Sequence, residues 1–258
     1  MRRAFVRPPG ENFAAALRSA ATISSTGATI DVALAQEQHA TYRAALCIAG
    51  VQVEELPPSD TYPDSCFMQD VALVVRGRAV IARPGAASRR GEEALVAPLL
   101  RERFPTLQIT SPGTLEGGDV LILPDRVYAG LSDRTNAEGI GQLRAALHPL
   151  PVEGIAVEGL LHLLSGVTYL GRNTLLAVRE MAHRPEFAGM EVLVVPDEEA
   201  YACNALGLGE FVIAPAGYER TIRLLEGAGF RVLPVPVSEF AKANGGVTCL
   251  SLVWEDEG

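Results

Sequence analysis

The sequence lacks any apolar stretch long enough to cross a membrane. Its longest apolar runs, such as Val71–Val75 and Val192–Pro196, are far shorter than the roughly 20 residues that a spanning helix requires. The basic residues near the N-terminus are not followed by the apolar segment of a secretory signal. We therefore expect a cytoplasmic protein without a membrane partner.

Cysteine and histidine are scarce, with four of each, and neither follows a metal-binding pattern. The cysteines contain no CxxC pair, and the histidines show no ligand spacing. A disulfide framework and a zinc cage are both excluded by this spacing. We expect a reduced protein that needs no metal and no organic cofactor.

Lysine is almost absent, since Lys242 is the single lysine among 22 basic residues, and acidic residues number 31. The resulting net charge of -9 disfavours binding to phosphate backbones, which requires a basic surface. Nucleic acid is therefore not expected as a partner.

What is present is the composition of a globular protein, with 258 residues of which 48% are hydrophobic. Apolar runs of strand length and amphipathic segments of helix length alternate along the chain. The expected strands are Ala4–Arg7, Val51–Leu56, Val71–Val75, Ala79–Ala82, Leu107–Thr110, Val120–Leu123, Val127–Gly130, Val152–Val157, Thr174–Val178, Glu191–Val195, Phe211–Ala214, Arg231–Val235 and Cys249–Trp254. The expected helices are Ala33–Ala49, Glu92–Glu102, Asn136–Leu147, with Thr135 as its N-cap, and Tyr218–Ala228.

These elements recur as a module of two or three strands and one helix about every fifty residues. No linker rich in Pro, Gly or Ser separates the modules. We therefore expect one α/β domain over residues 1–258, either a propeller-like array of repeats or a doubly wound sheet.

Cys249 is the candidate nucleophile, because it lies between a glycine turn, Asn244-Gly245-Gly246, and the last expected strand. A buried structural cysteine at the start of a strand is the competing interpretation. His162 stands in a leucine-rich segment, where a histidine is more often a core residue unless a partner lies near it.

Carboxylates precede two of the expected strands. Glu116 and Asp119 flank Gly117-Gly118 in what is either a site at a sheet end or an ordinary turn. Asp70 adjoins a strongly apolar strand, so it needs a cationic ligand or an arginine as a partner, whereas Asp64 after Pro63 is also a natural turn residue. A thiol, an imidazole and several carboxylates together suit attack on a positively charged carbon.

Six segments in this order resemble the dimethylarginine dimethylaminohydrolase family and span most of the chain. They are Pro63–Asp70, Arg83–Arg90, Thr114–Leu121, Gly130–Asn136, Leu161–Leu163 and Gly245–Cys249. The resemblance implies the pentein fold, a five-bladed α/β propeller with pseudo-fivefold symmetry and a central active site. A homodimer is compatible with it.

The resemblance also implies roles for individual residues. Cys249 would be the nucleophile, His162 the general acid and base, and Glu116 the carboxylate that orients His162. The implied substrate-binding residues are Asp64 for the amino group, Arg89 and Arg134 for the carboxylate, Asp70 for the guanidinium, and Phe67 and Gln69 beside them.

The implied reaction is hydrolysis of Nω-methylated arginine to citrulline and an alkylamine, through a covalent thiouronium on the cysteine. Three residues depart from the family pattern, namely Gln69 in place of Glu, Leu164 in place of Lys, and Asn244 in place of an acidic residue. The alternatives are a deiminase or amidinotransferase acting on another guanidino acid, and a non-catalytic protein that binds such a ligand.

Overall fold

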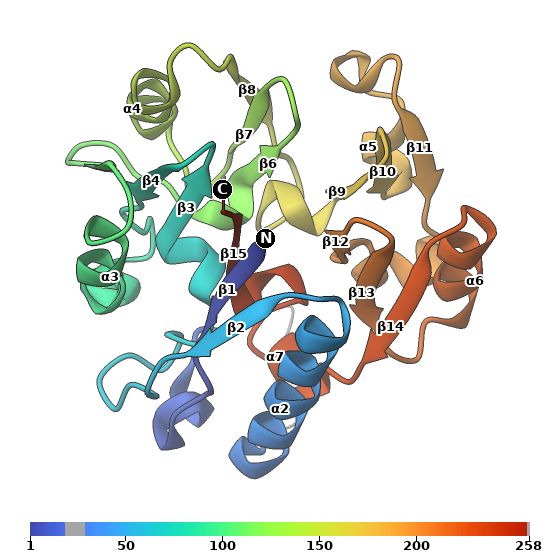
Figure 1. Cartoon of the computed structure of the whole chain (residues 1–258), viewed down its shortest axis with the longest axis horizontal. Coiled ribbons are helices and arrows are strands. Elements are labelled where there is room, and N and C mark those ends of the chain that lie inside the picture. The colour runs from blue at the N-terminus through green and yellow to red at the C-terminus, as the bar shows by residue number, and fades with distance from the viewer. Residues whose placement is uncertain (19–28, 257–258) are drawn as a thin grey trace.

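Five three-stranded sheets surround a common axis, and each belongs to a repeated strand–strand–helix–strand unit (Figure 1). The structure is a computed structural model that describes residues 1–18 and 29–256. In every sheet the middle strand pairs antiparallel with one neighbour and parallel with the other. The predicted five-bladed α/β propeller is confirmed by this arrangement.

The sheets follow the chain around the ring, starting from the one that contains both ends of the described chain. Their strands are β15 (Ser251–Glu255), β1 (Arg2–Val6) and β2 (Gln52–Glu55); β3 (Ala72–Val75), β4 (Arg78–Ile81) and β5 (Thr106–Gln108); β6 (Val120–Ile122), β7 (Val127–Leu131) and β8 (Val152–Ala156); β9 (Val167–Gly171), β10 (Thr174–Ala177) and β11 (Glu191–Val194); and β12 (Leu206–Leu208), β13 (Phe211–Pro215) and β14 (Arg231–Val235).

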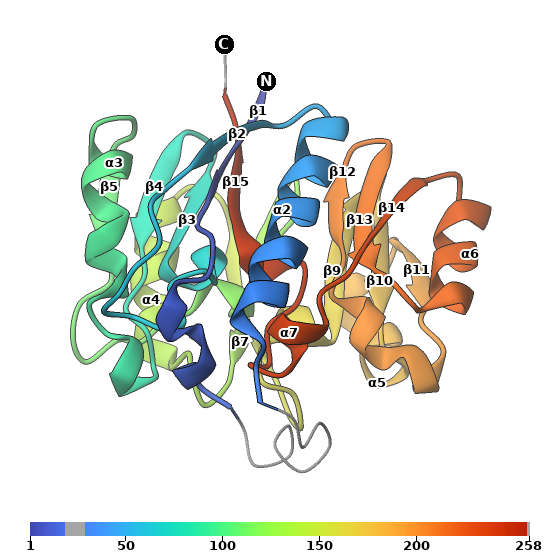
Figure 2. The same ribbon diagram turned by 90° about the horizontal axis from the view of Figure 1, so that it is seen from below.

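One helix connects the middle and outer strands of each sheet and lies on the outside of the ring (Figure 1, Figure 2). These helices are α2 (Val32–Ile48), α3 (Ala97–Arg101), α4 (Ala137–Leu147), α5 (Arg179–Ala182) and α6 (Glu219–Gly227), and α7 (Ser238–Ala241) packs beside α2. In the described residues no helix is long and apolar enough to span a bilayer.

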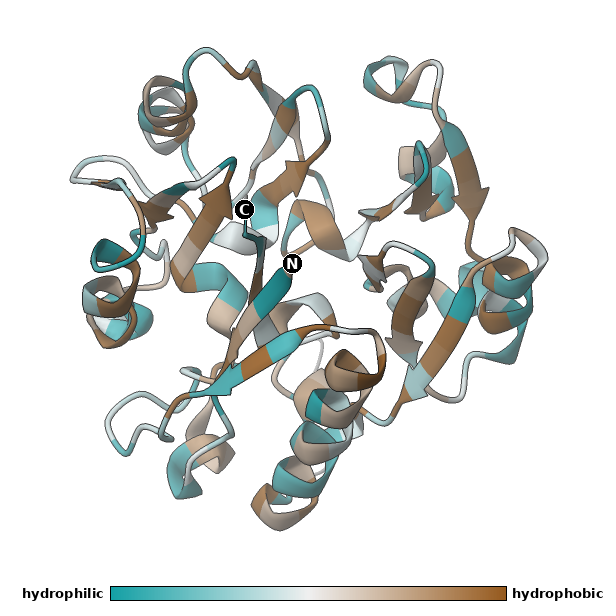
Figure 3. Cartoon of the chain, viewed as in Figure 1, coloured by the Kyte–Doolittle hydropathy of each residue, from teal (hydrophilic) through white to brown (hydrophobic). Residues whose placement is uncertain are grey.

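The first strand of each unit is the inner one. Strands β3, β6, β9, β12 and β15 together line an axial cavity of about 620 Å³. All four residues of Ala72–Val75 are buried, which explains the continuous apolar pattern of that strand. Figure 3 shows the strands as predominantly hydrophobic, and the buried apolar side chains of the described chain form four clusters between sheets and helices.

The structure differs from the predicted elements at several points. Strands β9 and β12 and the short helices α5 and α7 were not predicted. The predicted helix Glu92–Glu102 is a 3₁₀ turn, Glu92–Leu95, followed by α3, with Pro98 in the first turn of α3. The N-cap of α4 is Asn136 rather than Thr135, because the Asn136 side chain accepts a hydrogen bond from the Gly139 amide at 2.8 Å.

Candidate active site

Short 3₁₀ turns come directly before the inner strands and converge at one end of the axis. They are η2 (Met68–Val71), η5 (Gly117–Asp119), η6 (Leu163–Ser165), η8 (Asp197–Cys203) and η9 (Thr248–Leu250). Neighbouring turns contact one another in the order η9, η2, η5, η6, η8. The repeat therefore brings five equivalent points of the chain together.

The predicted site residues lie on these turns. Asp70 is in η2, Glu116 is the N-cap of η5, His162 is the N-cap of η6, and Cys249 is in η9. Positions that are far apart in the sequence thus meet because each one occupies the same place in its unit.

A small cavity of about 30 Å³ lies between these turns. It is lined by eight of the nine predicted site residues and by five others. The predicted ones are Asp64, Phe67, Asp70, Arg89, Glu116, Arg134, His162 and Cys249, and the others are Leu17, Leu161, Ala243, Asn244 and Gly245.

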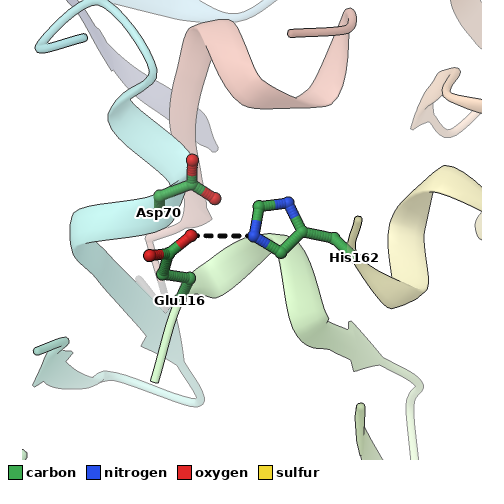
Figure 4. A group of neighbouring side chains, drawn as sticks. All are labelled: Asp70, Glu116 and His162. Carbon is green, nitrogen blue, oxygen red and sulfur yellow. Dashed lines mark hydrogen bonds and ion pairs between the residues drawn. The ribbon is translucent and has the colours of Figure 1, made fainter. Parts of the chain in front are cut away.

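His162 and Glu116 form a buried pair. His162 Nε2 lies 2.8 Å from Glu116 Oε2, as Figure 4 shows beside Asp70. The second oxygen of Glu116 accepts the backbone amides of Gly85 and Ala86 at 3.0 and 3.3 Å. Both oxygens of Glu116 therefore have partners, which fixes the plane of the carboxylate against the imidazole.

The charges of this pair stabilise one another. Burial opposes ionisation of Glu116, yet the hydrogen bond and the positive charge of His162 lower the pKa of Glu116 to about 2. Burial also disfavours the imidazolium, but Asp70, the Glu116 hydrogen bond and Asp119 raise the pKa of His162 above its usual value. The site is thus built to hold a proton on His162.

Cys249 is buried and is a neutral thiol in this arrangement. Burial raises the pKa of its thiol to about 12, Asp70 adds to the effect, and Arg89 opposes it. Its Sγ accepts a hydrogen bond from the Gly246 amide at 3.4 Å. A thiolate at neutral pH therefore requires an additional positive charge in the cavity.

Arg89 already has two carboxylate partners. It is 4% exposed, and its Nη1 lies 2.6 Å from Asp70 Oδ2 while its Nη2 lies 2.8 Å from Glu92 Oε2. Asp70 Oδ1 accepts the Gly118 amide at 3.1 Å. The guanidinium beside Asp70 is therefore one that the chain itself supplies.

The residues implied to bind the amino-acid end of a substrate differ in burial. Asp64 is buried, and both its oxygens accept the Leu17 amide, at 3.1 and 3.2 Å. Arg134 is 22% exposed, and its Nη1 lies 3.5 Å from Glu116 Oε1. Arg134 is thus the more accessible of the two predicted carboxylate-binding arginines.

Gln69 does not line the site cavity. It borders the axial cavity instead, and its Oε1 is buried without a hydrogen-bond partner in the described chain. A 3₁₀ turn has three residues per turn, so consecutive side chains point about 120° apart. Gln69 and Asp70 are adjacent in η2 and consequently face different cavities.

Two polar residues join the turns, and sequence reasoning missed the second of them. Asp119 Oδ1 accepts the Leu163 amide at 3.0 Å, and its Oδ2 accepts the Ser132 hydroxyl at 2.6 Å. Asn204, the C-cap of η8, accepts the Thr248 amide at 2.8 Å. The only feature of the sequence that could have indicated a role for Asn204 was its position before the inner strand β12, and that strand was not predicted either.

Asp70, Glu116 and His162 each offer a ligand atom within 4.8 Å of the others. Two carboxylates on one cavity wall attract a cation, and a buried thiol beside them can attack an electrophilic carbon once it is ionised. The arrangement therefore suits nucleophilic attack on a cationic group, with His162 as the proton carrier.

Comparison with known proteins places the chain among hydrolases of one kind. Residues 19–251 match the family model described as N,N dimethylarginine dimethylhydrolase, eukaryotic. The chain is 42% identical over 226 residues to N(G),N(G)-dimethylarginine dimethylaminohydrolase of Pseudomonas aeruginosa, covering 86% of this chain and 89% of the relative. It is 39% identical to the protein of the same name from Streptomyces coelicolor, covering 86% and 87%.

Solved structures give the same grouping. The P. aeruginosa enzyme, as a C249S mutant complexed with citrulline, has a TM-score of 0.93 and 39% identity, covering 98% of each chain. The structure of a dimethylarginine dimethylaminohydrolase H162G adduct with S-methyl-L-thiocitrulline also has a TM-score of 0.93. It is 39% identical, covering 98% of this chain and 99% of that one. The N-terminal domain of ArgZ, an arginine dihydrolase, shares the fold at 23% identity, with a TM-score of 0.85 and coverage of 98% of each chain.

Proposed function

Since the chain belongs to the dimethylarginine dimethylaminohydrolase family, we propose that it hydrolyses Nω-methylated arginine to citrulline and a methylamine. The observation that carries the proposal is the cavity in which Cys249, the His162–Glu116 pair and Asp70 meet. No metal or organic cofactor enters the reaction. A cytoplasmic location remains part of the proposal and accords with four free cysteines in the described chain.

Cys249 is the nucleophile of the proposed reaction. Its thiol pKa of about 12 has to fall before it attacks, and a guanidinium bound against Asp70 supplies the missing positive charge. The substrate thus activates the thiol that attacks it. The thiol releases its proton to solvent, and the Cys249 thiolate adds to the guanidinium carbon, so that the new carbon–sulfur bond forms as a carbon–nitrogen double bond becomes single.

His162 moves the protons of both half-reactions. As an imidazolium held by Glu116 at 2.8 Å, it donates a proton to the substituted nitrogen, and the carbon–nitrogen bond breaks to release the amine. The neutral imidazole then takes a proton from water, which attacks the thiouronium carbon. Expulsion of the Cys249 thiolate leaves citrulline, so that one water is consumed for each amine released.

The amino-acid end of the substrate is assigned to Asp64 and Arg134, with Phe67 lining the same cavity. Arg134 can read a carboxylate with two parallel hydrogen bonds. Asp64 exchanges the Leu17 amide for the substrate ammonium group. Because the Leu17 amide donates to both oxygens of Asp64 in the structure, Leu17 has to give up this bond when the substrate ammonium group binds.

The role implied for Arg89 changes in the proposal. Because Arg89 is buried between Asp70 and Glu92, it serves mainly to hold Asp70 in place and to lower the pKa of the Cys249 thiol. Gln69 is left out of the substrate contacts, because it borders the other cavity. Deimination of arginine stands as the second candidate, since the same residues would release ammonia from an unsubstituted guanidinium.

Release of the ureido product from a panel of guanidines tests the proposal, and this product is citrulline for the arginines and carbamoylputrescine for agmatine. Dimethylarginine and monomethylarginine should be hydrolysed, with arginine slower and agmatine, which lacks the carboxylate, slower still. Cys249→Ser should lose essentially all turnover, while Cys47→Ser at an exposed position should retain it. Faster turnover of arginine than of either methylated arginine would favour the deiminase.

A further inference from the structure

A further cavity, distinct from the axial cavity and called the second cavity below, meets the site cavity at Cys249 and His162. It has a volume of about 230 Å³, and the two cavities share Asn244 and Gly245 as well as the two reactive side chains. In the proposed reaction, the carbon that Cys249 attacks would therefore lie where the two cavities meet.

The two cavities differ in charge. The site cavity is bordered by Asp64, Asp70, Arg89, Glu116 and Arg134. In the part of the chain that the structure describes, no carboxylate, arginine or lysine borders the second cavity. Its walls include Leu160, Leu164, Val178, Tyr201, Ala200 and Ser165.

This division matches the two ends of a substituted arginine. The zwitterionic head and the guanidinium need charged partners, whereas an N-alkyl group gains free energy from leaving water for an apolar wall. We propose that the second cavity binds the N-alkyl substituent and then the amine that it becomes, an inference that rests on the proposed function.

The size of the second cavity determines which N-alkyl groups it can accept. A volume of about 230 Å³ is several times the share of one water, ~30 Å³, and is more than a dimethylamino group fills. Arginines with longer N-alkyl groups are therefore substrates as well. Leu164, which stands where the resembling family often has Lys, contributes an apolar side chain to this wall.

Steady-state citrulline formation from Nω,Nω-dimethyl-, Nω-propyl- and Nω-butylarginine tests this inference. The unmodified protein should turn over the propyl compound with a kcat/KM within about 10-fold of that for the dimethyl compound. Ser165→Leu and Ala200→Phe each reduce the room in the cavity. Each should lower the ratio of propyl to dimethyl kcat/KM by about 10-fold or more, the range for one methylene in an apolar pocket.

Ala216→Phe is the matched control, because Ala216 is exposed and borders neither cavity. Its ratio should equal that of the unmodified protein. Rejection of propyl- and butylarginine with normal turnover of dimethylarginine would overturn the inference and leave the proposed function intact, as would an equal loss on all three substrates in both cavity variants. Absence of citrulline from every substrate would overturn both.

A different observation supports a second inference, about how the turns are held together. In three places a side-chain oxygen on one turn accepts an amide of another turn. Asp70 accepts from Gly118 at 3.1 Å, Asp119 from Leu163 at 3.0 Å, and Asn204 from Thr248 at 2.8 Å. Asn204 Nδ2 also donates to the Leu164 carbonyl at 3.2 Å.

These bonds reach the residues next to His162 and Cys249. Asp119 and Asn204 are buried, at 0% and 8% exposure, and unpaired buried amides are costly. We infer that Asp119 and Asn204 are positioning residues, Asp119 for the turn of His162 and Asn204 for the turns of His162 and Cys249 together. Neither lines the site cavity, although Asn204 borders the second cavity.

Asp119→Asn separates positioning from general destabilisation. The titratable and charged groups around His162 come from several elements. They are Glu116 and Asp119 from η5 and its N-cap, Asp70 from η2, Cys249 from η9, Arg89 and Arg134, which face Asp70 and Glu116, and Asp64 in the same cavity. Because the Asp119 charge favours the imidazolium, its removal should move the His162 limb of the kcat pH profile to lower pH. Ser132→Ala removes another partner of Asp119 but keeps the charge, so it should leave that limb in place.

Asn204→Ala should lower kcat at least 10-fold with a smaller change in KM, and should slow alkylation of Cys249 by a haloacetamidine. Asn204→Asp retains the acceptor for Thr248 and should recover part of the loss. Equal pH profiles for Asp119→Asn and the unmodified protein would overturn the role of Asp119. Unchanged kcat in Asn204→Ala would overturn the role of Asn204.

Discussion

Gly118 shows how closely the reactive side chains are packed. A Cβ at this position would lie 2.7 Å from His162 Nδ1 and 2.9 Å from Asp70 Oδ1. Such distances are shorter than real contacts of a Cβ, so one of the two side chains has to move. The glycine that precedes Asp119 is therefore required by the space inside the site rather than by a turn.

We predict that Gly118→Ala lowers kcat by ~100-fold or more, the range for removal of a general acid–base group, because it displaces His162. Gly141→Ala in α4 is the matched control, since a Cβ there meets nothing within 4 Å and alanine favours a helix by about 1 kcal/mol. Steady-state rates and thermal unfolding of both variants check this. A fully active Gly118→Ala protein would contradict the packing described above.

A second prediction about a single residue concerns Gln69. Because it borders the axial cavity, we predict that Gln69→Glu changes kcat/KM for dimethylarginine and for arginine by less than a few-fold and by similar factors. If Gln69 faced the substrate, the added charge would strengthen binding of a guanidinium by a charge-assisted hydrogen bond worth about 1.5–3 kcal/mol. A selective gain of that size for either substrate would place Gln69 in the site.

The residue patterns left Cys249, His162 and Glu116 each with a competing structural interpretation, and only the family resemblance selected the three, which the structure brings together in one cavity. The sequence was not sufficient to show that Gln69 faces away from Asp70. Sequence adjacency implied a shared role, whereas the 3₁₀ turn directs the two side chains into separate cavities. The pairing of Arg89 with Asp70 was equally hidden, since the two residues lie 19 positions apart in the sequence.

At the scale of elements, the start of α4 is tied to the segment that leads to Glu116. Asn136 Oδ1 accepts the amides of Gly139 at 2.8 Å and Thr114 at 3.0 Å. Its Nδ2 donates to the Pro112 carbonyl at 3.0 Å. One side chain thus caps the helix and anchors the neighbouring loop.

We predict that Asn136→Ala lowers the free energy of unfolding by about 1–2 kcal/mol, as expected for loss of an N-cap together with an unpaired amide. Asn136→Asp retains both accepted bonds and loses only the donor to Pro112, so it should cost less. Urea unfolding of the two variants compares them. Equal stability of Asn136→Ala and the unmodified protein would show that water replaces the cap without cost.

Long, strongly patterned elements were predictable, and short ones were not. The helix predicted at Ala33–Ala49 agrees within one residue at each end with α2, whose 17 residues contain several turns of the amphipathic pattern. Strand β12, Leu206–Leu208, has three residues interrupted by Gly207, and α5 has four. Elements of that length contain too little periodicity to be distinguished from loops. Strand β12 forms because β13 pairs with it, and α5 packs against β10 and β11.

At the scale of the whole molecule, stability should fall in mild acid because of a histidine remote from the site. His39 in α2 is 1% exposed, and its Nε2 has no hydrogen-bond partner in the described chain. Burial, assisted by Arg43, lowers its pKa to about 4. The unfolded chain, with an ordinary histidine pKa near 6.5, therefore binds a proton that the folded chain excludes.

Because the unfolded chain binds this proton more readily than the folded chain, acid favours unfolding. As pH falls from 7 to 5, protonation of the unfolded state should remove about 2 kcal/mol of stability through His39, at ~1.4 kcal/mol per pH unit. We predict that His39→Leu loses correspondingly less stability over this interval than the unmodified protein, as measured by urea unfolding at both pH values. His162, with its raised pKa, contributes in the opposite direction in both proteins and cancels in the comparison. Parallel losses would mean that His39 does not control this acid response.

The pairing of β1 with β15 determines when the protein can become active. Because synthesis proceeds from the N-terminus, β1 (Arg2–Val6) stays without its antiparallel neighbour until Ser251–Glu255 has emerged. Cys249 stands just before that final strand, in contact with the turn that carries Asp70. A chain that ends before Cys249 thus lacks both the strand that closes the ring and the proposed nucleophile, so it should not react with guanidines.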